Sequence, residues 1–405
     1  MNEPVRKRTS AWKILGIVVG VILLSIVALI VWAAAAGSRK VARMQERSRV
    51  HLAAVKAADG RRPVLRGDAQ EGNAWEDYAL AQAEARKFPQ ALRLGEIVDR
   101  SPKADPELAK AALAAHAVAI DHLRRGAGRA SSCAGYEWEQ GHRMHLPPMV
   151  DFSTTANLAL LQARALVAEG KSRDAAGVLL DVCQYGRDQA SDGVVISYMV
   201  GTAILANAFT EIKDHLAAGK FDKAALEDLD RGLKVLEGSF PRYGQVIMNE
   251  ALLFTGGLLD ESADGGGGPM RLVYADGVEK MSYAMAATAS TESLPWAEAR
   301  KEIKRIETEA QDSWNPISRM TIPSLSTSGR VGRQRLAQLR LLREAVHWSL
   351  SGQLLDLEDP FGAKLSFQEK AGKLKIWSIG PDGVDDGGAG DWKSHLKDIP
   401  LEINR

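Results

Sequence analysis

Five carboxylate side chains lie close together near the end of the chain, in a glycine-rich stretch of residues 382–398: Asp382, Asp385, Asp386, Asp391 and Asp398. A hard cation such as Ca²⁺ takes six to eight oxygen ligands, and a flexible glycine-rich loop can turn carboxylates and main-chain carbonyls inward together. The spacing is not that of an EF-hand, because no Glu closes a twelve-residue loop. By composition alone the stretch therefore favours a solvated acidic turn, and a calcium site is the alternative.

Two short segments before this loop must position it. Residues 364–369 and 373–379 alternate apolar and polar side chains on either side of Ala371-Gly372, which predicts a β-hairpin. A lone hairpin is marginally stable in water. We therefore expect this hairpin to pack on the preceding helix or on a further strand.

The order of motifs around the hairpin is specific. Asp359-Pro-Phe-Gly362 precedes it, Ser378-Ile-Gly-Pro-Asp-Gly383 follows it, and Asp398-Ile399 closes the loop. Over residues 359–399 this order resembles the C-terminus of the major pseudopilin of type II secretion systems. The resemblance implies a structural calcium ion, with Asp382 and Asp398 as the best side-chain ligands and with Asp385, Asp386, Asp391 and carbonyls near Ser378 as further candidates. The prepilin cleavage motif of that family is missing here, so we do not predict a pilus subunit.

The N-terminal region predicts a membrane anchor. Ile14 to Ala36 is a run of 23 residues without a charge, which as a helix would span about 35 Å and cross a hydrocarbon core of roughly 30 Å. Trp12 and Trp32 lie near its ends, where indole rings favour the interface. A cleaved signal peptide is the competing interpretation, but its apolar core would be only about 7–15 residues long.

The orientation of this anchor follows less directly from charge. Basic residues flank it on both sides, four before and five after: Arg6, Lys7, Arg8, Lys13, and then Arg39, Lys40, Arg43, Arg47, Arg49. The positive-inside bias is therefore nearly cancelled, although long C-terminal domains translocate largely regardless of charge. We expect residues 1–13 in the cytoplasm and a periplasmic body at a bacterial inner membrane. The whole chain resembles uncharacterised bacterial membrane-anchored helical proteins.

The body between anchor and hairpin predicts a mainly α fold, an irregular array of α-hairpins. Two hinges share one design: Gly170 and Gly219 each follow a helix, and Ser172 and Asp222 each precede the next as its cap. The expected units are a helical body over 37–258, a Gly-rich loop over 259–269, a second helical region over 270–350, and the pseudopilin-like tail over 351–405.

Three features of this body leave alternatives open. The charge-free run 193–210 suggests a helix buried in the bundle, with a second membrane span as the alternative. The arginines of 331–349 suggest a solvated helix face rather than an anion site. Cys133 and Cys183 could pair only if the body is exported.

The composition excludes some functions. The chain has 405 residues, with 52 basic against 51 acidic groups, and this balance argues against a broad nucleic-acid surface. Two cysteines exclude a zinc site of four thiolates. We expect a membrane-anchored interaction or scaffold protein with an unidentified protein partner, more a binding protein than an enzyme. The alternatives are an accessory component of a type II secretion or pilus-like system, and an extracytoplasmic hydrolase.

Overall fold

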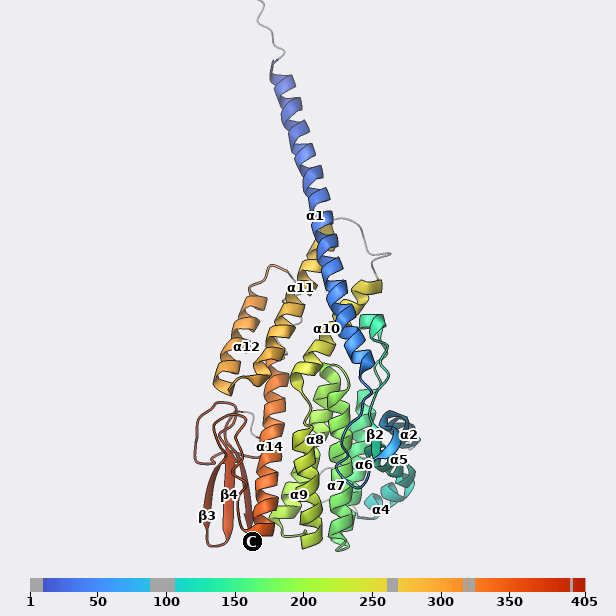
Figure 1. Ribbon diagram of the computed structural model, residues 1–405, viewed down its shortest axis with the longest axis vertical. Helices are drawn as coiled ribbons and strands as arrows, with labels where there is room; N and C mark the ends of the chain where they lie inside the picture. Colours follow the sequence, from blue (N-terminus) through green and yellow to red (C-terminus); the bar gives the residue numbers. More distant parts are fainter. Residues whose placement is uncertain are drawn as a thin grey trace, which may run out of the picture.

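The computed structural model describes residues 10–87, 106–260, 269–315, 319, 325–393 and 396–404. The predicted fold class is confirmed. One long helix rises out of a bundle of helices, and a small sheet lies against the bundle near the C-terminus (Figure 1).

The elements follow one another as a long run of helices that ends in the sheet. The helices up to the middle of the chain are α1 (Ser10–Ala57), α2 (Ala74–Arg86), α4 (Pro106–Ala115), α5 (Ala117–Ala127), α6 (Met149–Ala168), α7 (Ser172–Ser191), α8 (Val195–Ala217) and α9 (Lys223–Gly238). The later helices are α10 (Tyr243–Asp260), α11 (Pro269–Ser290), α12 (Trp296–Gln311) and α14 (Leu325–Ser351). Short 3₁₀ helices lie at Trp138–Arg143 (η1) and Thr291–Ser293 (η2), and a parallel pair of strands is formed by β1 (Gln70–Asn73) and β2 (Arg129–Ser131).

The outer half of α1 is a candidate membrane span. Its large apolar side chains are exposed, among them Val18, Leu24 at 71% and Trp32 at 64%. Only 6% of its most apolar window is buried against the rest of the protein. A free apolar helix surface of this length suits a bilayer, since water would disfavour it.

The inner half of α1 is part of the body. From Ala33 onward one face of the helix is buried against α10 and α11, and it includes Val41 and Met44. Lys40 Nζ lies 2.8 Å from carboxylate oxygens of both Asp276 and Glu279 on α11. The helix therefore continues without a break from the predicted span into the folded body.

Both predicted hinges are present, with one difference. Gly170 and Gly219 have φ of 75° and 63°, left-handed values that glycine adopts without strain. Asp222 caps α9 by accepting a hydrogen bond from Ala225 N at 2.8 Å. The prediction that Ser172 caps α7 was wrong: Ser172 lies inside the helix, and its Oγ accepts a hydrogen bond from Asp222 N at 3.3 Å. The Ser172 hydroxyl thus connects the two hinges and does not cap α7.

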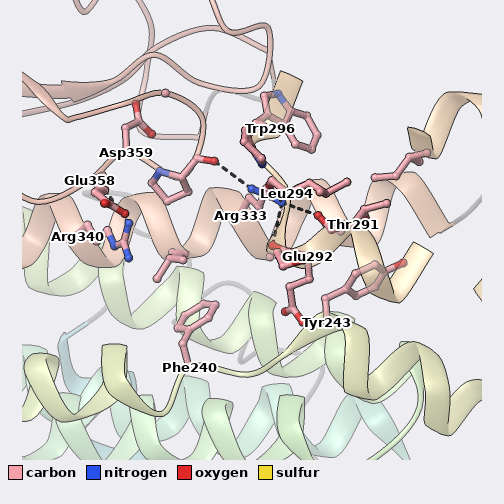
Figure 2. A pocket seen from close by; sticks show the side chains of 18 of the residues that line it. Phe240, Tyr243, Thr291, Glu292, Leu294, Trp296, Arg333, Arg340, Glu358 and Asp359 are labelled. Carbon is pink, nitrogen blue, oxygen red and sulfur yellow. Dashed lines mark hydrogen bonds between the residues drawn. The ribbon is translucent and has the colours of Figure 1, made fainter. Parts of the chain in front are cut away.

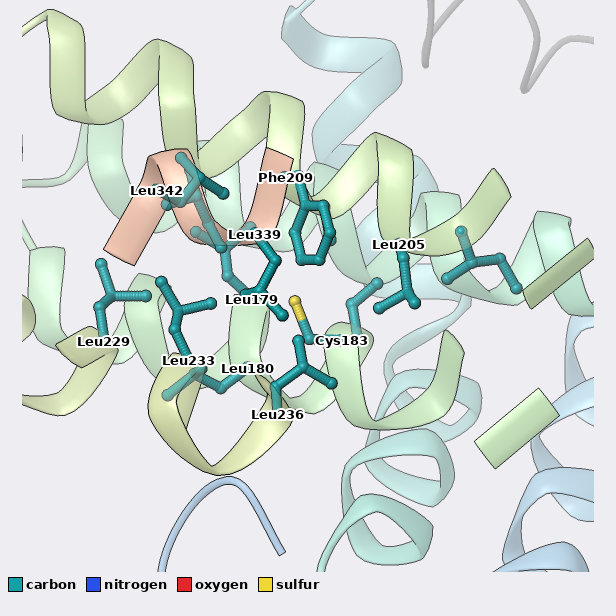
Figure 3. Packing of buried hydrophobic residues seen from close by; sticks show 14 of the residues in the cluster. Leu179, Leu180, Cys183, Leu205, Phe209, Leu229, Leu233, Leu236, Leu339 and Leu342 are labelled. Atoms are coloured by element: carbon teal, nitrogen blue, oxygen red, sulfur yellow. The ribbon is translucent and has the colours of Figure 1, made fainter. Parts of the chain in front are cut away.

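The core lies where α7, α8, α9 and α14 converge (Figure 3). Leucines are prominent among the side chains that meet there: Leu179, Leu180, Leu205, Leu229, Leu233, Leu236, Leu339 and Leu342, with Phe209 beside them. Cys183 is fully buried among these residues, whereas Cys133 is exposed, and both thiols are free. A disulfide between them is therefore not formed.

The charge-free run at 193–210 falls in α8, which is long and apolar enough to cross a membrane. However, 61% of its most apolar window is buried inside the protein. It packs against α7, α6 and α14. The interpretation as a core helix accounts for this burial better than a second span does.

The predicted hairpin is confirmed and gains a third strand. Strands β3 (Ser366–Lys370) and β4 (Lys373–Ser378) are antiparallel, and Ala371 and Gly372 turn between them with positive φ. Strand β5 (Ile399–Asn404) pairs with the other edge of β4. Apolar residues of β4 and β5, such as Ile376 and Leu401, face α14 and α8. The hairpin is thus stabilised by both a further strand and the helices.

The arginines of α14 do not form a solvated face, and that prediction was wrong. Arg340 Nε donates to Glu237 Oε1 at 2.7 Å, and Arg343 donates to the other oxygen of the same carboxylate. Arg343 is only 9% exposed. The reason is that Glu237, at the end of α9, lies directly against α14 in the bundle.

Candidate functional site

The acidic loop joins β4 to β5, and the turn at Asp359 holds its first residues. Asp359 is buried, and its carboxylate accepts hydrogen bonds from Phe361 N at 2.9 Å, Ser378 Oγ at 2.8 Å and Ile379 N at 2.8 Å. Burial raises the pKa of Asp359, and these hydrogen bonds oppose that rise. The Asp-Pro-Phe-Gly motif therefore fixes the end of β4, from which the loop departs.

Asp398 lies at the other end of the loop, just before β5, and is fully buried. Its Oδ2 accepts hydrogen bonds from Gly388 N at 2.7 Å and Asp386 N at 3.0 Å. Its Oδ1 is also buried, and no described residue offers it a hydrogen bond. Burial raises the pKa of Asp398, and the nearby charges of Asp385 and Asp386 raise it further. The described residues thus compensate this carboxylate only in part.

Glycines allow the loop to fold closely around Asp398. A Cβ on Gly380, which has a φ of 70°, would lie 2.1 Å from Lys397 O. A Cβ on Gly390 would lie 2.0 Å from Asp398 O. Any side chain at either position would displace the backbone that carries Asp398, so the glycines bring the loop's main chain against this residue.

Two of the other predicted aspartates lie near Asp398. Asp385 Oδ1 accepts hydrogen bonds from Trp377 Nε1 at 2.8 Å and Gly387 N at 2.9 Å, and the bond from Trp377 lowers the pKa of Asp385. Asp386 donates its backbone N–H to Asp398, while its own carboxylate lies 3.8 Å from Lys397 Nζ. Both contribute negative charge, but both carboxylates have partners within the chain.

The remaining two predicted aspartates close local turns. The carboxylate of Asp382 accepts a hydrogen bond from Val384 N at 3.1 Å, and that of Asp391 accepts one from Lys393 N at 2.7 Å. Within the described ranges, no three His, Cys, Asp or Glu side chains converge in a way that could hold a metal ion. The five aspartates are neighbours in sequence without sharing one centre.

The residues fit a cation that depends on one carboxylate and on the main chain. Asp398 Oδ1 is a buried oxygen without a partner among the described residues, and the surrounding loop is rich in glycine. Main-chain carbonyls and water are ordinary Ca²⁺ ligands, so a site needs few carboxylates. Asp398 could therefore hold a calcium ion together with loop carbonyls, with Asp385 and Asp386 adding negative potential.

We call strands β3, β4 and β5, together with the Asp359 turn and the acidic loop, the sheet module. A cavity of about 580 Å³ lies where the sheet module meets the helices (Figure 2). Its walls come from α14, from the turn between α11 and α12, from the connection between α9 and α10, and from the Asp359 turn. Phe240, Tyr243 and Trp296 supply aromatic surface. A cavity of this size and lining can accept a small amphipathic molecule.

Arg333 joins the two sides of this cavity. Its Nη2 donates to the carbonyls of Thr291 at 3.0 Å, Glu292 at 3.2 Å and Leu294 at 2.9 Å, and its Nη1 donates to Pro360 O at 3.3 Å (Figure 2). These bonds cap the turn after α11 and hold the Asp359 turn beside it. Arg333 therefore connects the helical region to the sheet module, a role that the spacing of arginines in the sequence does not reveal.

The sequence signals for the loop were its acidic, glycine-rich composition and the motif order that points to Asp382 and Asp398, and the described residues do not bring three of these carboxylates to one centre. Asp398 differs from the other four aspartates because it is fully buried and its Oδ1 has no partner among the described residues. The burial and pairing of Asp359 could have been suspected from the Asp-Pro-Phe-Gly motif alone. Comparison of the chain with protein-family models, with curated proteins and with solved structures finds no match.

Proposed function

We propose that this protein is a membrane-anchored helical interaction protein whose C-terminal sheet module is ordered by one structural calcium ion. The anchor is the outer half of α1, which exposes an apolar surface. The body carries the interaction surface for a protein partner, and the calcium ion stabilises the module that packs on α14 and α8.

The observation that supports calcium is the unpaired, buried Oδ1 of Asp398. A fully buried carboxylate normally has its oxygens paired, because an unpaired buried charge is costly. Asp398 Oδ2 has two amide donors, whereas Oδ1 has none among the described residues. A divalent cation at Oδ1 would compensate this charge and also the neighbouring charges of Asp385 and Asp386.

Calcium occupancy bears on where the body lies. A site of the extracellular type, with a Kd near 10⁻⁴ M, would contribute about 1.4 kcal/mol at roughly 1 mM Ca²⁺. At the submicromolar calcium of a cytosol the same site would contribute almost nothing. A working site therefore agrees with a periplasmic body, an N-terminus in the cytoplasm and a bacterial inner membrane.

A second candidate function is an accessory role in a type II secretion or pilus-like system. What favours it is the sheet module, in which the Asp359 turn, the hairpin, the glycine-rich loop and Asp398-Ile399 follow in the pseudopilin-like order. Co-purification with secretion components from native membranes would support this role. Recovery of a partner that belongs to no such system would count against it.

The calcium proposal is tested by thermal unfolding of the full chain in phosphatidylcholine nanodiscs, after treatment with EDTA. We expect 1 mM Ca²⁺ to raise the unfolding temperature of the wild type and Mg²⁺ to raise it less. Asp398→Asn keeps an acceptor for the two amides but loses the charge, so it should abolish the calcium response.

Matched controls are Asp382→Asn and Asp391→Asn, whose carboxylates close only local turns. Both should retain the rise with calcium. An unchanged wild-type unfolding temperature in millimolar calcium would contradict the proposal. Loss of the response in the two control variants as well would restore the prediction that all five aspartates share one site.

A further inference from the structure

Two exposed arginines lie on α1 just beyond the predicted span. Arg39 and Arg43 are four residues apart and exposed, the latter with 65% of its side chain accessible. The opposite side of the same turns is buried, at Ala33, Val41 and Met44. Since residues four apart share a helix face, Arg39 and Arg43 form one exposed stripe.

The position of this stripe along α1 places it at the bilayer surface. The helix is continuous through residue 57, so its rise of 1.5 Å per residue puts Arg39 about 5 Å and Arg43 about 10 Å beyond Ala36. The headgroup layer on each side of the hydrocarbon core is roughly 5–8 Å thick. Arginine side chains reach several ångströms along an interface, so both guanidinium groups can meet lipid phosphates.

The neighbouring cations are already engaged. Lys40 is on the flank of the helix and bridges Asp276 and Glu279 of α11. Arg47 lies over the ring of Tyr283, 5.4 Å from its centroid. Arg39, in contrast, has no ion pair with any residue in the described part of the chain, which is consistent with its outward direction.

Two carboxylates lie near the stripe without neutralising it. Arg43 Nη2 is 3.8 Å from Glu279 Oε1, but Glu279 also pairs with Lys40 at 2.8 Å. Glu46 lies one turn further from the span and is 3.9 Å from Arg49. The stripe therefore keeps a positive balance at the level of the headgroups.

We propose that Arg39 and Arg43 bind the phosphate groups of anionic phospholipids, and that this contact holds the helical body against the membrane surface. This inference rests on the proposed membrane anchor. Guanidinium groups bind phosphate in a bidentate manner, and each basic residue near an anionic surface strengthens association about five-fold. Because α10 and α11 are fixed to the same helix, lipid contacts at the stripe set the height of the body above the bilayer.

The test uses the full chain in membranes that contain equal amounts of phosphatidylglycerol and phosphatidylcholine. Sodium carbonate extraction first reports whether the chain is an integral membrane protein. Native mass spectrometry of the purified chain then gives the ratio of bound phosphatidylglycerol to bound phosphatidylcholine. We expect the wild type to favour phosphatidylglycerol and the Arg39→Gln/Arg43→Gln variant to lose about five-fold of this preference per arginine.

Two further variants sharpen the result. Arg39→Lys/Arg43→Lys keeps the charge and should retain most of the preference, whereas Arg49→Gln, about 20 Å beyond Ala36, should leave it unchanged. Extraction of the wild type by carbonate would overturn the anchor itself. An integral chain with no preference, or with one that survives Arg39→Gln/Arg43→Gln, would overturn the lipid site and leave the anchor intact.

Discussion

Asp188 in the helical body and Asp398 in the sheet module are both fully buried, yet the described residues pair both carboxylate oxygens of Asp188 alone. Asp188 Oδ2 lies 2.7 Å from both Arg62 Nη2 and Tyr78 OH. Its Oδ1 accepts hydrogen bonds from Gln184 and Arg187, each at 3.0 Å. Asp398 has two amide donors on one oxygen and no described donor on the other.

This difference means that the helical body compensates its buried carboxylate with its own residues, whereas the sheet module, as we propose, depends on an added cation. In the body, the segment after α1 brings Arg62 to α7, and the guanidinium also donates to Arg129 O at 2.7 Å and Gly126 O at 3.1 Å. In the sheet module, the described part of the loop supplies amides and glycines but no cation at Asp398 Oδ1. We therefore expect the body to be stable without ligands and the module to respond to an added cation.

The largest expected effect comes from breaking the Asp188 network. Asp188→Ala would leave Arg62 buried without a carboxylate, and removing one partner of a buried ion pair typically costs about 3–5 kcal/mol. Urea unfolding of the full chain in nanodiscs, followed by helical circular dichroism, should show this loss equally in EDTA and in calcium. Arg62→Met/Asp188→Leu should recover part of it, because no buried charge then remains at position 62, while Arg187 loses its carboxylate but keeps its bond to Ser239 O.

A result within 1 kcal/mol of the wild type for Asp188→Ala would contradict this account of the body. So would a loss that calcium reverses, since calcium is expected to act only on the module.

A smaller loss of stability is expected from removing the hydrogen bonds by which Arg333 connects the helices to the sheet module. Arg333→Met would remove its bonds to the Thr291, Glu292 and Leu294 carbonyls and to Pro360 O. Hydrogen bonds from a charged donor are worth about 1.5–3 kcal/mol, so we expect a loss of roughly 2 kcal/mol. Hydrogen exchange should increase around the turn before α12 and around the Asp359 turn, while the α7 core stays protected.

The control for this variant is Arg231→Met, since Arg231 on α9 has 72% of its side chain exposed. If Arg333→Met made hydrogen exchange at the turn before α12 and at the Asp359 turn no faster than in the α7 core, Arg333 would not be the connection between the helices and the sheet module.

The smallest effect concerns pH. The pKa of Asp398 is raised by burial and by Asp385 and Asp386, so its contribution to stability is complete below the unfolded pKa of about 4. That contribution is lost as pH rises through the higher folded pKa, because the unfolded chain then binds fewer protons than the native chain. In EDTA, the unfolding temperature of the wild type should therefore fall relative to Asp398→Asn as pH rises above about 4.

Saturating calcium should cancel this fall, because the cation compensates the ionised carboxylate. If the unfolding temperatures of the wild type and Asp398→Asn changed in parallel with pH in EDTA, ionisation of Asp398 would not destabilise the native state.

Local patterns made part of this structure predictable. The apolar run of α1, the Gly170 and Gly219 hinges and the hairpin around Ala371 all depend on neighbouring residues, and all are present. The third strand escaped prediction because Ile399–Asn404 is short and contains a proline. Ser172 was misassigned because its partner, Asp222, is distant in sequence.

The candidate site was less predictable for the same reason. The aspartates near the C-terminus were easy to see, but the burial of Asp398 depends on close main-chain approaches at Gly380 and Gly390. The importance of Asp188 could not be predicted from the sequence, because its partner Arg62 lies in a distant segment of the chain. Composition identified the loop, the motif order pointed to Asp382 and Asp398, and the packing distinguished Asp398, which is fully buried, from Asp382, which closes a local turn.

The most direct test of the difference between Asp188 and Asp398 is a calcium titration of the EDTA-treated full chain in phosphatidylcholine nanodiscs, by isothermal calorimetry. The proposed site predicts one calcium ion per chain with a Kd near 10⁻⁴ M, lost in Asp398→Asn and retained in Asp391→Asn. The absence of saturable binding, or equal binding by Asp398→Asn, would contradict it.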